Sequence, residues 1–501
     1  MSLRSREPSS SKDSENSGLY LIVLLLCASF FAFYHSNAAY TSDEVWSVKT
    51  ASLPSGLLLT ALKADVHPPL YFQILSGWIR MFGIGERAVR SLSALFYLLA
   101  ILTLFQLGRE LYGNRLALIC AALYACSPLA ILSAQFARMY ALLSLLSILS
   151  TWLYVRFLNK AHNSYGPLAL YVAVNVLGTF THIAFFFTLF AQTVLYVVWK
   201  RRLDLKRIVI PVALSVLPYL VLWAPVLVRQ LGNSGEGLAW VKKPGLSMLT
   251  DVLFLYGGVL WLVLPLVLYL SWRKGFRFWN EVPNKILAPA LLALTIAPPL
   301  LISIFKPVFN SRLAIVGLHL FALSVVPLFS ECGIHLVPLV VVLLTACFLP
   351  VVHSSSEACD NRALAVHLDH TAHETDVAIF TSLTRLPIDY YLQQAAARQP
   401  VEFSFPREID THPGYEGRIT DPSRRPALQQ EAEQLVAKIG EMQLMNPALR
   451  VFFFHGSHPE IDALVERELE KYFERAPEQE IRCAGGSPYL TTVSVYRRRT
   501  N

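Results

Sequence analysis

The chain has 501 residues, of which 54% are hydrophobic and only 16% are charged. Soluble domains carry about a quarter charged residues, so this balance excludes an ordinary soluble protein and indicates a membrane protein. The formal net charge of +8 is explained by membrane topology and contact with anionic lipid, and it requires no nucleic-acid partner.

Apolar runs of about 20 residues recur between residues 18 and 352. A helix rises about 1.5 Å per residue, so such a run crosses the roughly 30 Å hydrocarbon core of a bilayer. The pattern predicts about eleven transmembrane helices, near residues 18–37, 88–108, 115–133, 139–156, 166–181, 183–199, 207–228, 250–271, 285–305, 312–330 and 334–352. The first run is longer than a signal-peptide core and no clear cleavage site follows it, so we expect it to remain as an anchor.

Segment 66–82 is apolar but short, and it contains Arg80. We predict that this segment lies in the membrane interface, because the basic loops and the basic N-terminus then all fall on one side, as the positive-inside rule requires. The N-terminus is therefore expected in the cytoplasm. The first loop, 38–87, and everything after residue 352 are expected outside.

The composition changes after residue 352, where charged stretches are interrupted by short apolar runs. The patterns predict strands and helices at four places: strands at 377–380 and 451–454, and helices near 426–444 and 460–475. Residues 399–425 are rich in Pro, Arg and Asp and are expected to form loops. The predicted domains are a cytoplasmic tail (1–17), a transmembrane domain (18–352) and a small extracytoplasmic α/β domain (353–501).

Five of the seven cysteines fall in apolar spans, where they are expected as small buried hydrophobic residues. Cys359 and Cys483 both fall in the expected external domain and can pair in an oxidising compartment, which their spacing alone does not establish. The sequence contains no P-loop, Rossmann fingerprint or zinc-finger spacing. No metal ligands and no cofactor are assigned, because no ligand cluster is visible, and the question of a divalent metal ion stays open.

Two adjacent carboxylates, Asp43 and Glu44, follow the first span. Adjacent side chains point in different directions on most backbones, so we expect the two acids to have separate roles. One would be aimed into a cavity, and the other would hold a partner or a loop. An alternative interpretation is that both cap the following helix, because Ser and Asp are favoured N-cap residues.

Three further motifs follow the acidic pair. They are His-Pro-Pro-Leu-Tyr at 67–71, Gly-Glu-Arg-Ala-Val-Arg-Ser-Leu-Ser-Ala at 85–94 and Ala-Arg-Met-Tyr at 137–140. Their order resembles the bacterial glycosyltransferases of the GT-C class that are related to protein O-mannosyltransferases and to the lipid A aminoarabinose transferase. The resemblance covers roughly residues 18–330. It implies a GT-C fold, a sugar donor carried on a polyprenyl phosphate, and a product of inverted anomeric configuration.

The resemblance also implies roles for the acidic pair. Asp43 matches the catalytic acid of the family's first external loop, and Glu44 completes the family's Asp-Glu pair. Asp43 would position or deprotonate an acceptor hydroxyl, which attacks the anomeric carbon from the face opposite the phosphate. General-base assistance of this kind is worth about 10²- to 10⁴-fold.

The departing phosphate gains negative charge, so cations or hydrogen-bond donors must face it. Three residues are candidates by the resemblance: His67 in the His-Pro-Pro motif, Arg138 in the Ala-Arg-Met-Tyr motif, and Arg312 after a proline turn. The two arginines also fit a different interpretation, interfacial snorkelling, in which long basic side chains reach lipid headgroups.

Other residues are candidates for lining the site: Tyr71, Glu86, Arg90, Tyr140 and His182. His182 resembles a Thr-His element that relatives carry between two helices, although a lone histidine is more often structural. Glu86 and Arg90 have helical i,i+4 spacing, so a salt bridge between them is an equal expectation. Phe136 departs from the family pattern, because many relatives carry Glu there; an acidic function at this position is absent or displaced.

We therefore expect a multi-pass plasma (inner) membrane glycosyltransferase that moves a sugar from a polyprenyl-phosphate donor to a lipid, glycan or protein acceptor on the outer face. The alternative is a non-enzymatic polytopic transporter or assembly protein for lipid-linked glycans, which would place its essential charges at mid-membrane depth. The sequence names neither the sugar nor the acceptor.

Overall fold

The computed structural model describes residues 11–34, 36–64, 67–159, 165–199, 206–233, 243–273, 286–331, 361–381, 384–395, 400–407, 422–455, 458–476 and 491–499, together with isolated positions between 338 and 349. The chain forms two compact units. The helical unit comprises Met1–Ser36, Thr50–Leu231 and Val241–Leu349. The C-terminal unit comprises Asn37–Lys49, Gly232–Trp240 and Pro350–Asn501. The question whether Cys359 pairs with Cys483 falls outside the described residues, as does most of the predicted span at 334–352.

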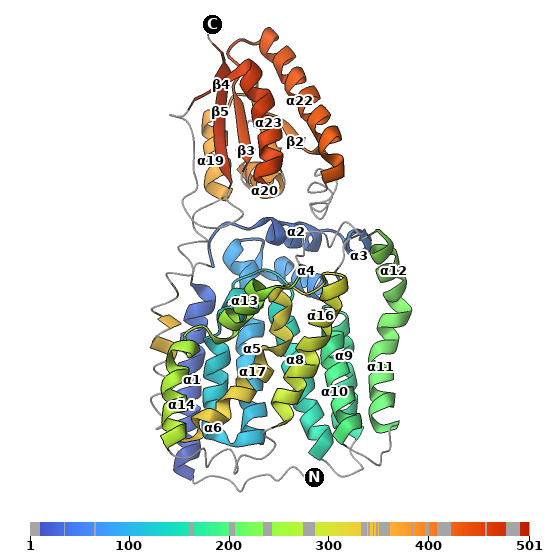
Figure 1. Cartoon of the computed structure of the whole chain (residues 1–501), viewed down its shortest axis with the longest axis vertical. Coiled ribbons are helices and arrows are strands. Elements are labelled where there is room, and N and C mark those ends of the chain that lie inside the picture. Colours follow the sequence, from blue (N-terminus) through green and yellow to red (C-terminus); the bar gives the residue numbers. More distant parts are fainter. Residues whose placement is uncertain are drawn as a thin grey trace. The chain divides into compact units, whose positions relative to one another are not determined.

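The helical unit is a bundle whose long helices run side by side (Figure 1). Its elements are α1 (Ser11–Phe33), α3 (Ser55–Ala64), α4 (Leu70–Phe82), α5 (Glu86–Tyr112), α6 (Asn114–Ala125), α7 (Pro128–Ala134), α8 (Tyr140–Asn159), α9 (Tyr165–Thr179), α10 (Phe185–Trp199), α11 (Lys206–Leu222), α12 (Ala224–Asn233), α13 (Leu246–Gly257), α14 (Leu260–Arg273), α16 (Leu287–Phe305), η1 (Ser311–Ala314), α17 (Ile315–Val325) and η2 (Val326–Glu331). Helix α2 (Ser42–Ala51) begins in the C-terminal unit and ends in the helical unit.

Within the part of the chain that the structure describes, four helices are long and apolar enough to span a membrane: Glu86–Tyr112, Tyr140–Leu158, Leu287–Phe305 and Ser311–Phe329. Two bent helix pairs bring the number to six if each pair forms one span. The chain is therefore a multi-pass membrane protein. The expected total of about eleven spans and the orientation of the termini stay predictions.

Two of the predicted spans, 115–133 and 250–271, are broken in the structure. Helices α6 and α7 meet at 64°, and helices α13 and α14 meet at 76°. Pro128, which cannot donate a backbone hydrogen bond, begins α7, and Gly258 takes a positive φ of 45° after α13. The two breaks pack together, because the Ser127 hydroxyl donates to the carbonyl of Leu255 at 2.7 Å and a Cβ on Gly258 would lie 2.7 Å from Pro128 Cδ. The chain thus satisfies a carbonyl that the end of α13 leaves unpaired.

Buried polar side chains join the helices that carry the candidate site. The Ser150 hydroxyl of α8 donates to the Asn175 side chain of α9 at 2.7 Å, and Gln192 of α10 donates to Ser150 at 3.1 Å. Tyr171 of α9 also donates to Gln192 at 2.7 Å. Hydrogen bonds of this kind help to hold membrane helices together, so they join α8, α9 and α10 within the bundle.

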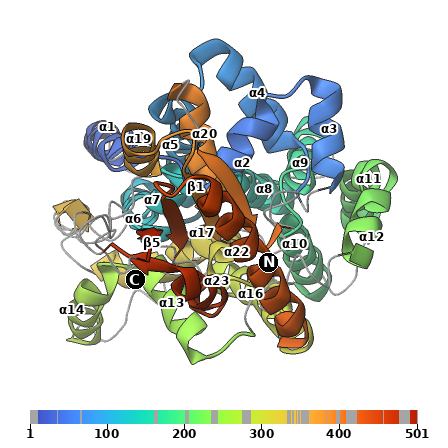
Figure 2. The same ribbon diagram turned by 90° about the horizontal axis from the view of Figure 1, so that it is seen from above.

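Helix α4 differs from the long helices because it lies crosswise to them (Figure 2). It has 13 residues, which span about 20 Å and are too few to cross a bilayer. One face is buried through Tyr71, Phe72 and Leu75, whereas Met81 and Phe82 at its end are exposed. These features support the predicted interfacial position of segment 66–82.

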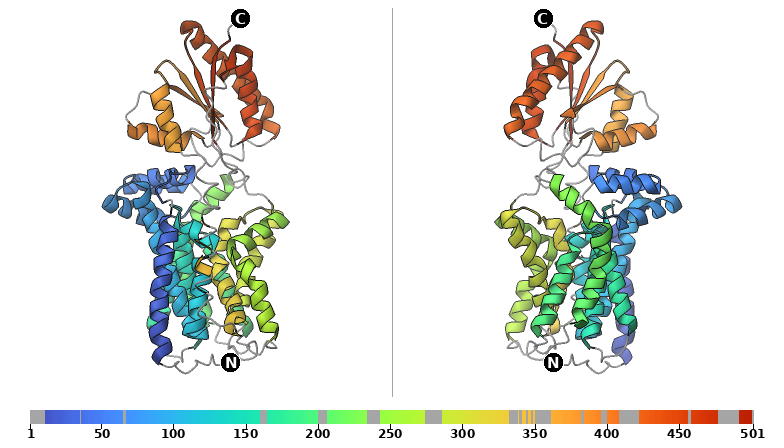
Figure 3. Two further views of the ribbon diagram at one scale, coloured as in Figure 1. Left: turned by 90° about the vertical axis from the view of Figure 1, so that its left-hand side faces the viewer. Right: turned by 90° about the vertical axis from the view of Figure 1, so that its right-hand side faces the viewer.

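The C-terminal unit contains a five-stranded sheet of order β2-β1-β3-β5-β4. Its elements are α19 (Asn361–Thr371), β1 (Val377–Thr381), α20 (Arg385–Ala395), β2 (Val401–Phe405), η6 (Pro422–Arg424), α22 (Arg425–Met445), β3 (Val451–His455), α23 (Pro459–Tyr472), β4 (Phe473–Arg475) and β5 (Thr492–Arg498). Strand β1 is parallel to β2 and β3, and β5 is antiparallel to β3 and β4. Because β2 and β3 flank β1 on opposite sides, right-handed crossovers place α20 and α22 on opposite faces. Figure 3 shows α19 and α20 on one face and α22 and α23 on the other.

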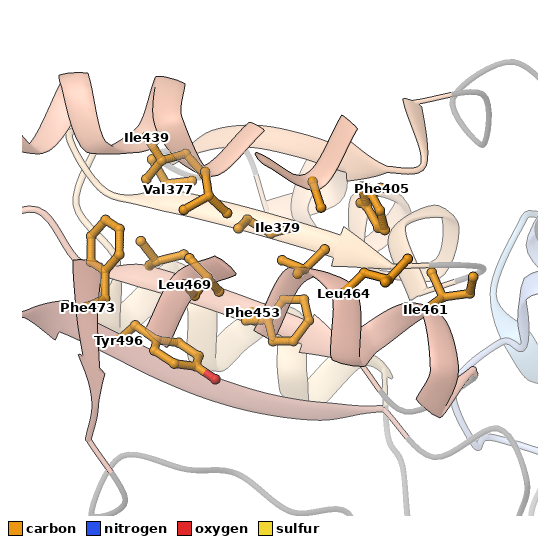
Figure 4. Close-up of a cluster of buried hydrophobic side chains, with 14 of the residues drawn as sticks. Val377, Ile379, Phe405, Ile439, Phe453, Ile461, Leu464, Leu469, Phe473 and Tyr496 are labelled. Atoms are coloured by element: carbon orange, nitrogen blue, oxygen red, sulfur yellow. The ribbon is translucent and has the colours of Figure 1, made fainter. Parts of the chain in front are cut away.

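Apolar side chains of the sheet and of α22 and α23 form one core (Figure 4). The central strands supply Val377 and Phe453, and the helices supply Ile439 and Leu469, all of which are buried. The strands predicted at 377–380 and 451–454 and the helix predicted near 426–444 are confirmed. The helix predicted near 460–475 is confirmed as far as Tyr472, and its last three residues instead form strand β4 (Phe473–Arg475). The prediction of loops throughout 399–425 is wrong, because Val401–Phe405 pairs with β1 as strand β2.

Candidate functional site

Glu44 closes a capping box at the start of α2. Its carboxylate accepts hydrogen bonds from the Thr41 backbone N–H at 3.1 Å and from the Thr41 hydroxyl at 3.2 Å. The Thr41 hydroxyl oxygen in turn accepts from the Glu44 backbone N–H at 3.4 Å. This reciprocal pairing is the Thr-x-x-Glu pattern that stabilises helix N-termini, and it leaves Glu44 fully buried. The geometry therefore makes Glu44 the acid that holds the loop.

Asp43 lies at the second position of α2, and its side chain is half-buried. Its backbone carbonyl accepts a hydrogen bond from the Ser47 hydroxyl at 3.0 Å. The partial positive charge at a helix N-terminus favours a carboxylate in the first turn. The side chain that caps α2 is that of Thr41, so the capping interpretation describes Thr41 and Glu44, and Asp43 lies inside the helix.

Arg138 and His67 form a buried pair in the helical unit. Arg138 lies in the turn between α7 and α8 and is only 5% exposed. One guanidinium nitrogen lies 3.1 Å from His67 Nε2. A guanidinium has no acceptor, so it donates to Nε2 and the ring proton of a neutral His67 lies on Nδ1. The buried guanidinium does not extend to the surface, and snorkelling therefore does not describe Arg138.

His182 lies beside this pair, in the turn between α9 and α10. Its ring centroid is 6.2 Å from that of His67 and 6.3 Å from that of Tyr140. The Ala184 backbone N–H donates to His182 Nδ1 at 3.0 Å, which places the proton of the neutral ring on Nε2. Burial, and after it the neighbouring His67 and Arg138, lower the pKa of His182 to about 3. His182 is therefore a neutral N–H donor near pH 7.

A backbone contact ties the segment that carries His67 to the turn that carries His182. The N–H of Leu70, at the start of α4, donates to the carbonyl of Phe180 at 3.1 Å. Tyr71, the next residue of α4, is fully buried. The two histidines thus come together because the His-Pro-Pro segment is pinned to the α9–α10 turn.

Arg312 reaches the same region through an aromatic side chain. Its guanidinium carbon lies 5.3 Å from the ring centroid of Phe136, a distance that allows a cation–π contact. Phe136 stacks on Tyr140 at 6.4 Å with an interplanar angle of 10°. Phe136 therefore gives Arg312 an aromatic partner. Arg312 itself is exposed, which fits both phosphate binding and snorkelling.

Arg90 binds the backbone of the segment that follows α1. It is 5% exposed, and its guanidinium donates to the carbonyl of Ser36, just after α1, at 3.0 Å. Glu86 begins α5 and is partly buried. The salt bridge expected between Glu86 and Arg90 stays a prediction.

The structure brings His67, Arg138, His182 and Tyr140 into one group, which we call the basic cluster, and links Arg312 to it through Phe136. A guanidinium and two imidazoles in one place are suited to bind an anion by charge-assisted hydrogen bonds. Asp43 and Glu44 belong to the C-terminal unit. Among the residues whose positions are described, no group of three or more His, Cys, Asp or Glu side chains can hold a metal ion.

Three residues that bind the first loop were not found from the sequence: Asn361, Arg362 and Tyr391. They lie more than 300 residues away from their partners, and no local pattern marks them. The capping box, in contrast, was readable as Thr41 followed by Glu44 three residues later.

Part of the chain matches the model of a known protein family. Residues 66–228 match the family model described as dolichyl-phosphate-mannose-protein mannosyltransferase. The match spans less than half of the chain. It includes His67, Arg138 and His182, whereas the acidic pair precedes it and Arg312 follows it. No curated protein matches the sequence.

Solved structures share the architecture at low sequence identity. The apo structure of ArnT from Cupriavidus metallidurans is 12% identical, with a TM-score of 0.58 over 96% of this chain and 98% of that chain. The same protein bound to undecaprenyl phosphate is 12% identical, with a TM-score of 0.56 over 95% of this chain and 97% of that chain. At such identity the likeness shows the fold alone.

The fold and the family match together confirm the resemblance to GT-C glycosyltransferases related to protein O-mannosyltransferases. The chain is thus related to membrane glycosyltransferases that use lipid-linked sugars. Neither finding names the sugar or the acceptor.

Proposed function

We propose that the protein is an inverting glycosyltransferase that moves a sugar from a polyprenyl-phosphate donor to an acceptor hydroxyl on the outer face of the plasma (inner) membrane. The observation that carries this proposal is the basic cluster, in which a buried guanidinium and two imidazoles lie at the turns of an apolar bundle. The matched family model names dolichyl-phosphate mannose, and the Cupriavidus relative was solved with undecaprenyl phosphate bound. Both support a polyprenyl-phosphate donor here.

In this proposal the basic cluster binds the donor phosphate. Arg138 supplies the charge, and the imidazoles of His67 and His182 supply neutral N–H donors. These groups act more strongly in a buried, water-poor setting than in bulk water, because the dielectric screening is weaker. They stabilise the leaving phosphate most when its negative charge has fully developed, so they favour bond cleavage. The polyprenyl chain stays in the hydrocarbon around the bundle.

Asp43 takes the acceptor proton. The acceptor oxygen forms a bond to the anomeric carbon while the bond from that carbon to the phosphate oxygen breaks. The acceptor proton passes to Asp43, and the electron pair of the broken bond leaves with polyprenyl phosphate. Attack from the face opposite the phosphate inverts the anomeric configuration. Glu44 holds Asp43 in place through the capping box rather than by touching the substrate.

The remaining candidates have supporting roles. Arg312, which contacts Phe136, gives a second cation to the phosphate, and Tyr140, which stacks on Phe136, lines the cluster. Tyr71, Glu86 and Arg90 shape the surrounding turns. We further assign residues 18–352 to the membrane domain and residues 353–501 to the extracytoplasmic domain, with the N-terminus in the cytoplasm.

The test is the release of free polyprenyl phosphate from radiolabelled polyprenyl-phosphate sugars by the purified protein in lipid, with a crude cell-envelope fraction as acceptor. We expect donor-dependent turnover by the wild type and at least a roughly 100-fold loss in Asp43→Asn, as for removal of a general base. Asp251→Asn, which changes an exposed aspartate on α13, is the matched control and should keep wild-type turnover.

Two results would count against the proposal. Full turnover by Asp43→Asn would remove Asp43 from the reaction. A folded protein that binds polyprenyl phosphate but turns over no donor would favour a transporter or assembly protein for lipid-linked glycans.

A further inference from the structure

Side chains of α19 and α20 hold the backbone of the first loop within the C-terminal unit. The Tyr40 N–H donates to the Tyr391 hydroxyl at 2.7 Å, and the Tyr40 carbonyl accepts from the Asn361 side-chain amide at 3.0 Å. Arg362 donates to the carbonyl of Asn37 at 2.8 Å. Both backbone groups of Tyr40 are therefore bound by side chains from distant parts of the chain, which fixes the peptide planes on either side of it.

Ring contacts reinforce these hydrogen bonds. Tyr40 is fully buried, and its ring meets that of Tyr390 edge to face, with centroids 5.7 Å apart and planes at 73°. The guanidinium of Arg362 lies 5.6 Å from the ring centroid of Tyr391, so one residue of the clamp also orients another. Asn361, Arg362, Tyr390 and Tyr391 are called the loop clamp below.

The charge of Lys49, near the other end of the same loop, acts on α20 through space. Lys49 lies in the last turn of α2 that still belongs to the C-terminal unit. Burial raises the pKa of Asp389 on α20, and the positive charges of Arg385 and Lys49 oppose that rise. The charge of Lys49 therefore favours the ionised form of Asp389, which is an electrostatic effect through space.

The clamp and the capping box are adjacent in the chain. Tyr40 is the last clamped residue, Thr41 caps α2, and Asp43 follows in the first helical turn. No flexible linker separates them, so a shift of Tyr40 moves the start of α2. A catalytic group that moves by about 1 Å can lose about 100-fold in rate. A small displacement of Tyr40 by the clamp is therefore expected to change the reaction rate strongly.

We propose that the loop clamp of the C-terminal domain is the positioning element for the first-loop acid: it sets where α2 begins and thereby where Asp43 meets the acceptor. This inference rests on the proposed function, because it gives Asp43 the catalytic role. It assigns the C-terminal domain a part in the transfer step, with the donor phosphate bound separately by the basic cluster.

A positioning role and a merely structural role differ in their kinetic effects. If the clamp positions Asp43, loosening it lowers kcat and leaves the KM for the donor unchanged, because Arg138 and the histidines keep their contacts. General destabilisation of the protein instead lowers the amount of active enzyme and leaves the kcat of the folded fraction unchanged.

The experiment uses the full-length protein in lipid and two readouts. Tyr391→Phe removes the hydroxyl that accepts from Tyr40 and keeps the ring. Hydrogen exchange of residues 37–49, which needs no substrate, should become roughly two- to tenfold faster, the factor that corresponds to one net hydrogen bond. The kcat for polyprenyl phosphate release should fall about tenfold, and about 100-fold when Asn361→Ala is added.

Two controls accompany these variants. Tyr472→Phe removes an exposed hydroxyl on α23 and should change neither readout. Arg362→Lys keeps a cationic donor and should retain most of the protection that Arg362→Ala loses. Rescue by Arg362→Lys indicates that a long cationic side chain is sufficient to hold the loop at Asn37.

The outcomes separate the two proposals. Unchanged exchange in Tyr391→Phe overturns the clamp, and faster exchange with an unchanged kcat overturns its positioning role. A higher donor KM with unchanged kcat also overturns it. If Asp43→Asn retains full turnover, the proposed function fails instead, and the exchange result alone then decides whether the clamp holds the loop.

Discussion

The acidic loop and the basic cluster are both small groups of polar side chains, yet different kinds of contact hold them. Tyr40 in the loop binds Tyr391 and Asn361, which are 351 and 321 residues away in the chain. In the basic cluster, His182 is held by Ala184 two residues further on, and Arg138 by His67, 71 residues away. The loop depends on the fold of a separate domain, whereas the cluster depends on turns between helices of one bundle.

Substitutions in different parts of the protein should therefore affect the loop and the cluster. Changes in the C-terminal unit should reach the acid and leave donor binding intact. Changes in the helix turns should weaken donor binding and leave the loop protected. The predictions below test whether the loop and the cluster depend on different parts of the protein.

The largest effect is expected for Arg138→Ala. The guanidinium is buried and charged, and loss of a buried, hydrogen-bonded charge partner costs about 2–5 kcal/mol, so binding of polyprenyl phosphate should weaken about 30-fold or more. Arg138→Lys keeps the charge but loses the planar fork, and its effect should be intermediate. The dissociation constant for polyprenyl phosphate, measured on purified protein in lipid, checks this order.

Arg109→Ala is the matched control, because Arg109 is exposed in the last turn of α5. It should bind polyprenyl phosphate as the wild type does. Equal and negligible effects of Arg138→Ala and Arg109→Ala would show that Arg138 has no part in binding the donor phosphate. If Tyr391→Phe weakened donor binding as much as Arg138→Ala does, donor binding would depend on the loop clamp as well, and the loop and the cluster would not be independent.

A smaller effect is expected for substitutions of Glu44, and it distinguishes a role in holding the loop from a role in catalysis. Glu44→Gln keeps a side-chain oxygen that can accept from Thr41, and glutamine also serves in capping boxes, so turnover should stay within about threefold of the wild type. Glu44→Ala loses the box, which is worth about 1 kcal/mol, and should lower kcat roughly tenfold. Turnover kinetics of the two variants check this. A loss in Glu44→Gln as deep as in Asp43→Asn would make Glu44 a catalytic acid instead.

The smallest expected effect is a dependence of stability on pH, and it arises in the C-terminal unit, which holds the loop. Burial, with the charge of Asp389, raises the pKa of Glu402 from its ordinary 4.5 to about 7, against the opposing charge of Arg385. The folded protein therefore holds this proton more tightly than the unfolded chain does. The resulting stability is fully present below pH 4.5 and is lost as the pH rises through about 7.

Hydrogen exchange of α20 and β2 measures this dependence in the full-length protein. After correction for the intrinsic pH dependence of exchange, protection should be a few-fold lower at pH 8 than at pH 5.5, on the order of 1 kcal/mol. Glu402→Gln should remove most of the difference. His182, with a pKa of about 3, does not titrate in this range. A pH effect that persists in Glu402→Gln would belong to another group.

Most of the fold could be predicted from local patterns. The helices of the bundle follow from apolar runs, and strands β1 and β3 follow from short apolar runs between polar stretches. Strand β2 was missed because its five residues follow a polar stretch and are stabilised by pairing with β1 at the edge of the sheet. The breaks after α6 and α13 did have local signals, Pro128 and the Gly257-Gly258 pair.

The candidate site could be predicted from the sequence only in part, because some of its contacts, like the pairing of β2 with β1, join separate segments of the chain. The histidines and Arg138 lie in turns with recognisable motifs, so sequence spacing found them. The contact of Arg312 with Phe136 follows from helix packing, and the loop clamp follows from contacts across more than 300 residues. Such contacts are properties of the folded chain, and no window of sequence contains both partners.

The most direct test of the account is an experimental structure of the Asp43→Asn variant in lipid with a polyprenyl-phosphate sugar bound. We predict that the donor phosphate lies about 3 Å from the Arg138 guanidinium and from an imidazole of the basic cluster. The side chain at position 43 should lie beside the anomeric carbon, on the face opposite the phosphate. A phosphate bound away from Arg138 would contradict the role of the basic cluster, and a sugar far from position 43 would contradict the catalytic role of Asp43.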